Sequence, residues 1–373
     1  MAAIFSIEAV KAKEGDCLLL HYGDGDDRRV VLVDGGPPGV YKSFLEPRLK
    51  QLTATLGDGD GGLPLELVMV SHIDQDHVAG VLQLLRAVEQ ATDDGRDTPY
   101  DVRELWHNAF HKIAGDEAVD PASLLSAVEK RREPPRSELV LASVAQGQDT
   151  AVVATKLGID RNGGQPLVLA GHRRELPGGL VLDAIGPSEA RVEALKRQWA
   201  EEIGAEPSEL VAAQLDDSVF NLSSLLVVAS LGKLRMLLTG DGLAGDVLAG
   251  LEAADLLDAK RKAHFDVLKV PHHGSDRNVD TEFFRRVTAD HYVISGDGKH
   301  SNPELATLEM IDDARGGDEY DIWLTYRTGR EGLGDKIAKF AADQRLAKRK
   351  ARLHFPEDGA DSLIVDLGTA VDY

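Results

Sequence analysis

Short apolar runs separated by turn residues mark the first part of the chain. We expect strands over Ile4–Val10, Cys17–Tyr22 and Arg29–Val33, with Gly23–Asp27 as the hairpin turn between the second strand and the third. Consecutive short strands joined by such turns predict an antiparallel meander.

The pattern changes after residue 40. Tyr41–Leu52 and Val78–Ala91 carry apolar residues at helical spacing, whereas Leu65–Val70 is a short apolar run typical of a buried strand. Val102–His111 is predicted to be a further strand with an aromatic face. The loop at residues 71–77 is therefore expected to be held between a strand and a helix.

Residues 116–179 interrupt this order of elements. The segment is polar and broken by prolines, and we expect only short helices in it, over Pro121–Arg131 and Asp149–Leu157. We interpret it as an insertion that lies over the functional site, because loops on a rigid scaffold often carry function.

The second half alternates between strand and helix. Together with the meander, this alternation predicts an α+β fold, a four-layer αββα sandwich. We expect residues 1–373 to form a single domain, with the insertion at about 116–179 and a C-terminal helix–strand extension at about 320–373. The expected strands are Gly179–Ile185, Leu222–Ser230, Leu234–Leu238, Phe265–Val270, His291–Ile294, Ile322–Tyr326, Ala351–Phe355 and Ser362–Leu367, and the helices are Pro187–Ile203, Gly242–Leu257, Pro303–Ala314 and Gly334–Lys350.

The charge of the chain limits the possible partners. Lys and Arg number 42 and Asp and Glu 63, so the formal net charge is −21. This excess argues against broad affinity for nucleic acid or for anionic membranes. Two basic clusters, Lys130–Arg132 with Arg136 and the run from Arg345 to Arg352, could still meet phosphates, although solvated helix faces are the favoured explanation of each.

Cysteine content and hydropathy exclude further kinds of protein. Cys17 is the single cysteine, which excludes an intrachain disulfide and a thiolate-rich metal site. No apolar run approaches the ~20 residues that cross a bilayer, and the first residues lack the features of a signal peptide. We expect a cytoplasmic protein that does not bind membranes, and the sequence identifies no protein partner or oligomeric state.

The loop Ser71–His77 contains the most closely spaced candidate metal ligands. His72, Asp74, Asp76 and His77 directly follow a predicted buried strand, and imidazole and carboxylate groups packed this closely call for a metal ion or a hydrogen-bond network. The alternative is a polar loop with two surface histidines and an acidic cap for the following helix.

Other predicted strand ends offer the same residue types. Asp34, Asp241 and the pair His272 and His273 each follow a strand. If these strand ends meet at one edge of the fold, two divalent ions could share a carboxylate there. His107 and His111 are candidate ligands by residue type alone.

The loop Gly296–Pro303 is a further candidate. Its glycines, Lys299 and His300 suit an anionic oxygen or a leaving group. An ordinary helix start, with Asn302 as the cap and Pro303 in the first turn, explains those two residues but neither Lys299 nor His300.

The motif His72-x-Asp74-x-Asp76-His77 looks like the H-x-H-x-D-H signature of the metallo-β-lactamase fold hydrolases, with aspartate in place of the second histidine. This variant resembles the β-lactamase-like domain of ComEC-type DNA-uptake proteins and their soluble relatives. The likeness extends to Glu14–Cys17, Val33–Gly36, Leu238–Asp241 and Val270–Ser275.

The resemblance implies a centre of two divalent ions, zinc or manganese. His72 and Asp74 would bind the first ion, and Asp241 would bridge the two. His272 would contact the ligands or the substrate, and Asp34 would orient the loop. The second ion would be held by Asp76, His77 and His273.

One position departs from the family. Where the third family motif has a histidine, this chain has Asn221, and an amide oxygen is a weaker ligand than imidazole. With Asp74 also in place of a histidine, we expect an oxygen-rich first site that prefers Mn²⁺ or Mg²⁺, binds zinc loosely or stays empty.

These observations favour a metal-dependent hydrolase. The resemblance points to a phosphodiesterase or nuclease in which a metal-bound hydroxide attacks the phosphodiester, with Asp76, His272 and His300 in the catalytic site and Asp34, Asn221 and Lys299 lining it. The alternatives are a hydrolase of a small ester, lactone or thioester, and a non-catalytic binding module. Hydrolysis of β-lactams is not expected, because the full histidine set is absent.

Overall fold

The computed structural model describes residues 3–25, 27–57, 62–109, 134–204, 223–343 and 350–373, without the side chains of 134–141 and 198–204. The predicted helix Pro121–Arg131 and the candidate residues His111 and Asn221 lie outside these ranges, as do most residues of the two basic clusters.

The first sheet combines both ends of the chain. Its strand order is β17-β1-β2-β3-β5-β7-β8, antiparallel from β17 to β3 and parallel from β3 onward. The predicted N-terminal meander is confirmed as β1 to β3. The strands are β1 (Ile4–Val10), β2 (Leu18–Asp24), β3 (Asp27–Val33), β5 (Leu67–Val70), β7 (Glu104–His107), β8 (Asp160–Arg161) and β17 (Ser362–Asp366).

The second sheet is built from the second half of the chain. Its order is β16-β15-β14-β13-β12-β11-β10-β9, antiparallel from β9 to β12 and parallel from β12 to β16. A separate parallel pair joins β4 (Leu63–Leu65) to β6 (Tyr100–Val102). The strands are β9 (Arg173–Glu175), β10 (Val181–Gly186), β11 (Leu226–Leu231), β12 (Leu234–Leu238), β13 (Ala263–Lys269), β14 (Val287–Ile294), β15 (Glu319–Leu324) and β16 (Lys350–His354).

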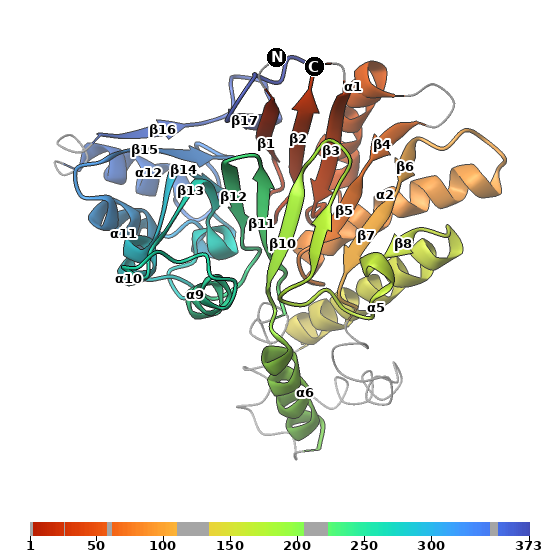
Figure 1. Ribbon diagram of the computed structural model, residues 1–373, viewed down its shortest axis with the longest axis horizontal. Coiled ribbons are helices and arrows are strands. Elements are labelled where there is room, and N and C mark those ends of the chain that lie inside the picture. The colour runs from red at the N-terminus through yellow and green to blue at the C-terminus, as the bar shows by residue number, and fades with distance from the viewer. Residues whose placement is uncertain (1–2, 26, 58–61, 110–133, 205–222, 344–349) are drawn as a thin grey trace.

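Helices cover the outer face of each sheet (Figure 1). A π-helical turn, Tyr41–Leu45, leads into α1 (Glu46–Leu56), which packs on the first sheet together with α2 (Gln75–Asp93) and α5 (Pro134–Lys156). In Figure 1, α6 (Glu189–Gly204) extends below the sheets. The second sheet is covered by α9 (Ala244–Ala253), α10 (Thr281–Arg286), α11 (Leu305–Arg315) and α12 (Leu333–Ala342).

The layers follow from the alternation of side chains along each strand. In β5, Leu67 and Met69 pack in the core between the two sheets, whereas Val68 and Val70 pack against the helices. Both faces of the strand are buried, which explains its nearly unbroken apolar run. The predicted four-layer αββα sandwich is confirmed.

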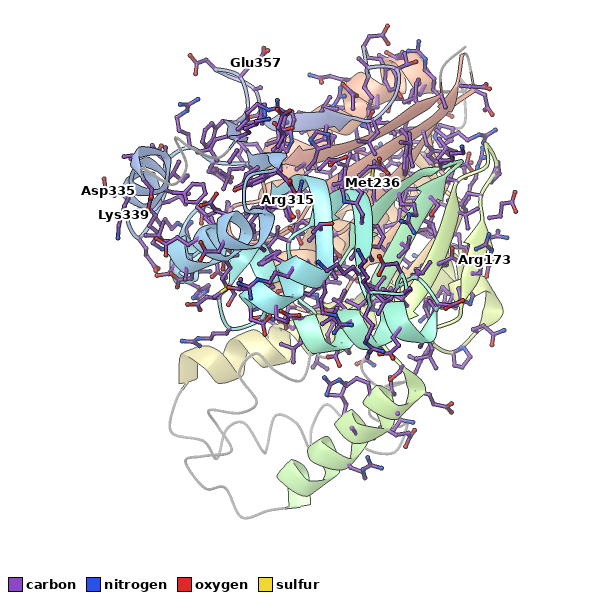
Figure 2. The ribbon with its side chains drawn as sticks, turned by 60° about the vertical axis from the view of Figure 1, so that its left-hand side comes forward. Arg173, Met236, Arg315, Asp335, Lys339 and Glu357 are labelled. Carbon is purple, nitrogen blue, oxygen red and sulfur yellow. The ribbon has the colours of Figure 1, made fainter. Side chains whose placement is uncertain are left out.

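The predicted basic helix Gly334–Lys350 is confirmed at its start, by α12, but wrong at its end. The helix α12 ends at Ala342, and Lys350 begins strand β16. Figure 2 shows Asp335 and Lys339 on the outer side of α12, whose apolar residues are buried. The predicted strand Ala351–Phe355 is confirmed as β16, where Arg352 forms an ion pair with Asp321 on β15.

Two smaller differences concern single elements. The predicted strand Val102–His111 ends at His107, and its start belongs to the separate strand β6. The short helix α10 was not predicted; its N-cap residue, Asp280, accepts a hydrogen bond from the Phe283 amide. Among the described residues, no helix is long and apolar enough to cross a membrane.

Candidate metal centre

The loop Ser71–His77 connects β5 to α2 as the sequence predicts. Asp74 occupies the N-cap position of α2 but its side chain makes no capping hydrogen bond, and Asp76 lies in the first turn. The interpretation of Asp74 as a simple helix cap is therefore not supported. The Gln75 amide donates to Ser143 Oγ of α5 at 3.1 Å, so part of the predicted insertion packs against this loop.

Asp34 fixes the orientation of the loop. It follows β3 with a φ of 59°, and its carboxylate accepts hydrogen bonds from the Ser71 amide at 2.7 Å and from Ser71 Oγ at 2.6 Å. His77 Nδ1 lies 2.9 Å from Asp34 Oδ2. Since a carboxylate only accepts, His77 donates from Nδ1 and keeps the lone pair on Nε2 free for a cation.

The turn after β3 is also bound to the start of α2 by its backbone. The Gly35 amide donates to the His77 carbonyl at 2.8 Å, and the Gly80 amide donates to the Gly36 carbonyl at 3.1 Å. A Cβ atom on Gly80 would lie 1.9 Å from the Gly35 carbonyl oxygen. Glycine at both positions therefore lets α2 approach close enough to hold His77 beside Asp34.

Asp241 lies at the middle of the cluster. Its Oδ1 is 3.5 Å from His77 Nε2 and 3.6 Å from His273 Nε2. Its Oδ2 is 3.6 Å from the Nε2 atoms of both His72 and His272. Four imidazoles from two distant segments thus surround one buried carboxylate, two on each oxygen.

The pair His272 and His273 comes from a short 3-10 turn, Pro271–Gly274, after β13. Both histidines have left-handed backbone conformations, with φ of 46° and 53°. The His272 amide donates to the Gly240 carbonyl at 3.0 Å, which joins this turn to the residue before Asp241. Consecutive side chains can therefore both face the same carboxylate.

Asp74 and Asp76 complete the two halves of the cluster. Asp74 Oδ2 lies 3.5 Å from His72 Nε2. Asp76 Oδ2 lies 3.7 Å from His273 Nε2, and its Oδ1 lies 4.0 Å from His77 Nε2. The structure thus brings together the six predicted ligands and His272.

These residues fit divalent cations. Among the described residues, the Nε2 atoms of His72, His77 and His273 and Oδ1 of Asp241 are buried without a hydrogen-bond partner. Buried polar atoms without partners are costly. Ligands bound tetrahedrally at about 2.0–2.2 Å lie about 3.3–3.6 Å apart, close to the spacing of this cluster.

The charges of the cluster are strongly coupled. Burial alone would raise the pKa of Asp241, but the four histidines around it hold that pKa well below its usual range. Burial opposes charge on His77 as well, yet Asp241, Asp34 and Asp76 raise its pKa well above the usual range. Burial likewise opposes charge on His273, but Asp241 and Asp16 raise its pKa to about 9. The field of the carboxylates thus favours positive charge at this place, whether from protons or from metal ions.

Asp16 is the residue that the sequence analysis missed. Asp16, His77, Asp241 and His273 offer ligand atoms within 4.8 Å of one another. Asp16 Oδ1 lies 3.4 Å from His273 Nδ1, while Oδ2 accepts a hydrogen bond from the buried Lys269 at 2.8 Å. With Lys269 on one oxygen, Asp16 is better placed to orient His273 than to bind metal. The motif Glu14–Cys17 marked the segment but not this role.

The loop at residues 296–302 lies against the histidine turn. Asn302 Nδ2 donates to the His272 carbonyl at 3.3 Å, and α11 begins only at Leu305 with Glu304 as its N-cap residue, so the predicted cap at Asn302 is wrong. His300 is exposed, and its amide donates to Glu331 at 3.2 Å. Lys299 Nζ pairs with Glu14 at 2.6 Å.

Two other candidates, His107 and Asn221, remain. His107 is buried at the end of β7, where its amide donates to Asn162 Oδ1 at 2.8 Å. It is not one of the four residues, Asp16, His77, Asp241 and His273, whose ligand atoms lie within 4.8 Å of one another among the described residues. Asn221 lies outside the described residues, so its prediction as a site-lining residue stays a prediction.

No family model matches the sequence. Among solved structures, the chain is similar to Zn²⁺-bound PqqB from Methylobacterium extorquens, at 12% sequence identity and a TM-score of 0.41. The likeness covers 97% of this chain and 100% of PqqB.

Proposed function

We propose that this protein is a metal-dependent hydrolase that holds two divalent ions on opposite oxygens of Asp241. The observation that carries the proposal is the arrangement of four histidine Nε2 atoms around this carboxylate at 3.5–3.6 Å. Oδ2 would serve the first ion with His72 and Asp74. Oδ1 would serve the second ion with Asp76, His77 and His273.

The ions, when bound, supply a nucleophile from water and neutralise the negative charge that develops during hydrolysis. The side chains of this chain set where that happens. Asp74 and Asp76 are 21% and 29% exposed, whereas Asp241 is buried. Substrate would therefore approach from the side that these two carboxylates line.

We propose a phosphodiester as the substrate. Two ions about 3.5–4 Å apart suit an in-line displacement, because one can stabilise the attacking oxygen and the other the leaving oxygen. The likeness of His72-x-Asp74-x-Asp76-His77 to ComEC-type domains supports the same choice. His300, exposed on a loop that contacts the histidine turn, is the proposed proton donor to the leaving oxygen.

The test compares substrates on metal-stripped protein resupplied with Mn²⁺, Mg²⁺ or Zn²⁺. We expect cleavage of bis-p-nitrophenyl phosphate and of single-stranded DNA, loss of at least 100-fold in Asp76→Ala, and full activity in His264→Ala. His264 is a suitable control because its side chain is 53% exposed on β13 and contacts Thr288 and Asp290.

Two outcomes would contradict the proposal in different ways. Cleavage of p-nitrophenyl acetate or a lactone, with neither phosphodiester cleaved, would replace the substrate class but keep the hydrolase. Stoichiometric metal binding without hydrolysis of any of these substrates would favour the binding module.

A further inference from the structure

We propose that His272 binds the first ion through Nε2 and takes the place of the histidine that the third family motif lacks in this chain. The inference rests on the proposed two-ion centre. It concerns a residue that the sequence places beside the ligands rather than among them.

The geometry around Asp241 is the first argument. His72 and His272 both lie 3.6 Å from Oδ2, as His77 and His273 lie 3.5 and 3.6 Å from Oδ1. Each oxygen thus has two imidazole nitrogens at matching distances. An ion on Oδ2 would meet His272 as readily as an ion on Oδ1 meets His273.

The tautomer of His272 is the second argument. Asn278 Nδ2 donates to the Asp241 carbonyl at 3.0 Å, which turns the amide oxygen of Asn278 toward His272. That oxygen lies 2.9 Å from His272 Nδ1. Because a carbonyl oxygen only accepts, Nδ1 carries the proton and Nε2 presents its lone pair to Asp241 and the ion.

The four imidazoles are oriented in the same way. Each Nδ1 has a polar neighbour of its own, namely Asn278 for His272, Asp34 for His77, Asp16 for His273 and Ser71 for His72. Groups that orient a histidine in this way are a recurrent feature of metal ligands.

The consequence is two matched sites. With His272, the first ion has two nitrogens and two carboxylates, from His72, His272, Asp74 and Asp241; the second has the same set, from His77, His273, Asp76 and Asp241. This replaces the expectation of an oxygen-rich, weak first site. Both sites suit zinc, since imidazole and carboxylate are ordinary zinc ligands.

The decisive measurement is the zinc content of the variants His272→Asn and His273→Asn after dialysis, by elemental analysis. Asparagine tolerates the left-handed backbone but is too short to reach the ion. We expect two equivalents in the wild-type protein, one in each variant and two in His264→Asn. In Mn²⁺-loaded protein, the spin-coupled electron paramagnetic resonance signal should give way to an uncoupled signal in both variants.

Two equivalents of zinc in His272→Asn, bound as tightly as in the wild type, would overturn the inference. If this variant does not fold, the variant Asn278→Ala provides the test. Loss of the group that orients His272 should lower the affinity for one of the two ions about 10–100-fold. An unchanged affinity in Asn278→Ala would refute the inference. A wild-type protein that binds fewer than two ions would instead refute the proposed centre, and two ions without hydrolysis would refute only the proposed function.

Discussion

At the scale of single residues, some residues of the site could be predicted from a sequence motif, whereas others are known only from their contacts in the structure. His72, Asp74, Asp76 and His77 could be found because they lie within six positions of one another. The role of Asp16 could not, because its partners Lys269 and His273 lie more than 250 positions away. A carboxylate beside a lone cysteine in a leucine-rich strand gives no local sign of such contacts.

Asp16 and Lys269 form an ion pair that is almost fully buried. Removing one partner leaves the other charge buried alone, so Lys269→Met should lower the free energy of unfolding of the metal-free protein by about 3–5 kcal/mol. Urea denaturation measures this loss. The double variant Asp16→Asn/Lys269→Met should lose less than the sum of the two single changes, and strict additivity would contradict the pair.

At the scale of elements, strand ends proved more informative than charge patterns. The apolar runs predicted β3, β5 and β13, and with them the segments after these strands that bring Asp34, His77 and His273 together. The end of the basic helix predicted from Gly334 to Lys350 was wrong, because charges on a strand edge and on a helix face look alike in sequence and Lys350 belongs to β16. Only the pairing of β15 with β16 shows that Arg352 faces Asp321.

The contact between α2 and the turn after β3 gives a prediction at this scale. Gly80→Ala would place Cβ 1.9 Å from the Gly35 carbonyl oxygen, so we expect a loss of about 3 kcal/mol in unfolding free energy and weaker binding of the second ion. Gly245→Ala in α9 is the matched control. A Cβ there meets nothing within 4 Å, and the change should stabilise the protein by about 0.5–1 kcal/mol. Equal effects in urea denaturation would contradict the packing argument.

The pairing of β1 with β17 gives a prediction about acid stability. Although burial opposes its charge, hydrogen bonds from His21 and Arg48 lower the pKa of Glu8 from 4.5 to about 2. Ser362 of β17 also donates to this carboxylate at 2.5 Å. Because the folded pKa is depressed, the stabilisation is complete above pH 4.5 and is lost as the pH falls toward 2.

The variant Glu8→Gln isolates this contribution. Between pH 4.5 and 2, the unfolding free energy of the wild type should fall more steeply than that of the variant, by on the order of 3 kcal/mol over the whole interval. Parallel curves for the two proteins would show that Glu8 does not titrate in this way.

At the scale of the molecule, the two sheets share one core and exchange chain segments. The last strand, β17, lies in the first sheet, while β16 just before it lies in the second. We propose that the chain forms one domain. Tryptophan fluorescence can test this, because each sheet contains a tryptophan. Trp106 lies on β7 of the first sheet, and Trp323 lies on β15 of the second.

Two variants with a single tryptophan each, Trp106 alone or Trp323 alone, would report on the two sheets separately. For one domain, their urea midpoints should coincide with each other and with the far-ultraviolet circular dichroism midpoint. Two separated midpoints would show that the sheets unfold as independent units.

The two chain termini lie at one end of the first sheet, and the candidate metal centre lies at the other. Ile4 pairs with Gly23 and Asp24 with Asp27, whereas Val33, next to Asp34, pairs with Leu18 at the other end of β2. The N-terminal strand thus begins, and the C-terminal strand ends, at the edge of the sheet away from Asp34 (Figure 1). A bead, dye or fusion partner attached at either end would leave the side lined by Asp74 and Asp76 open to solution, so immobilised protein should screen candidate substrates as well as free protein does.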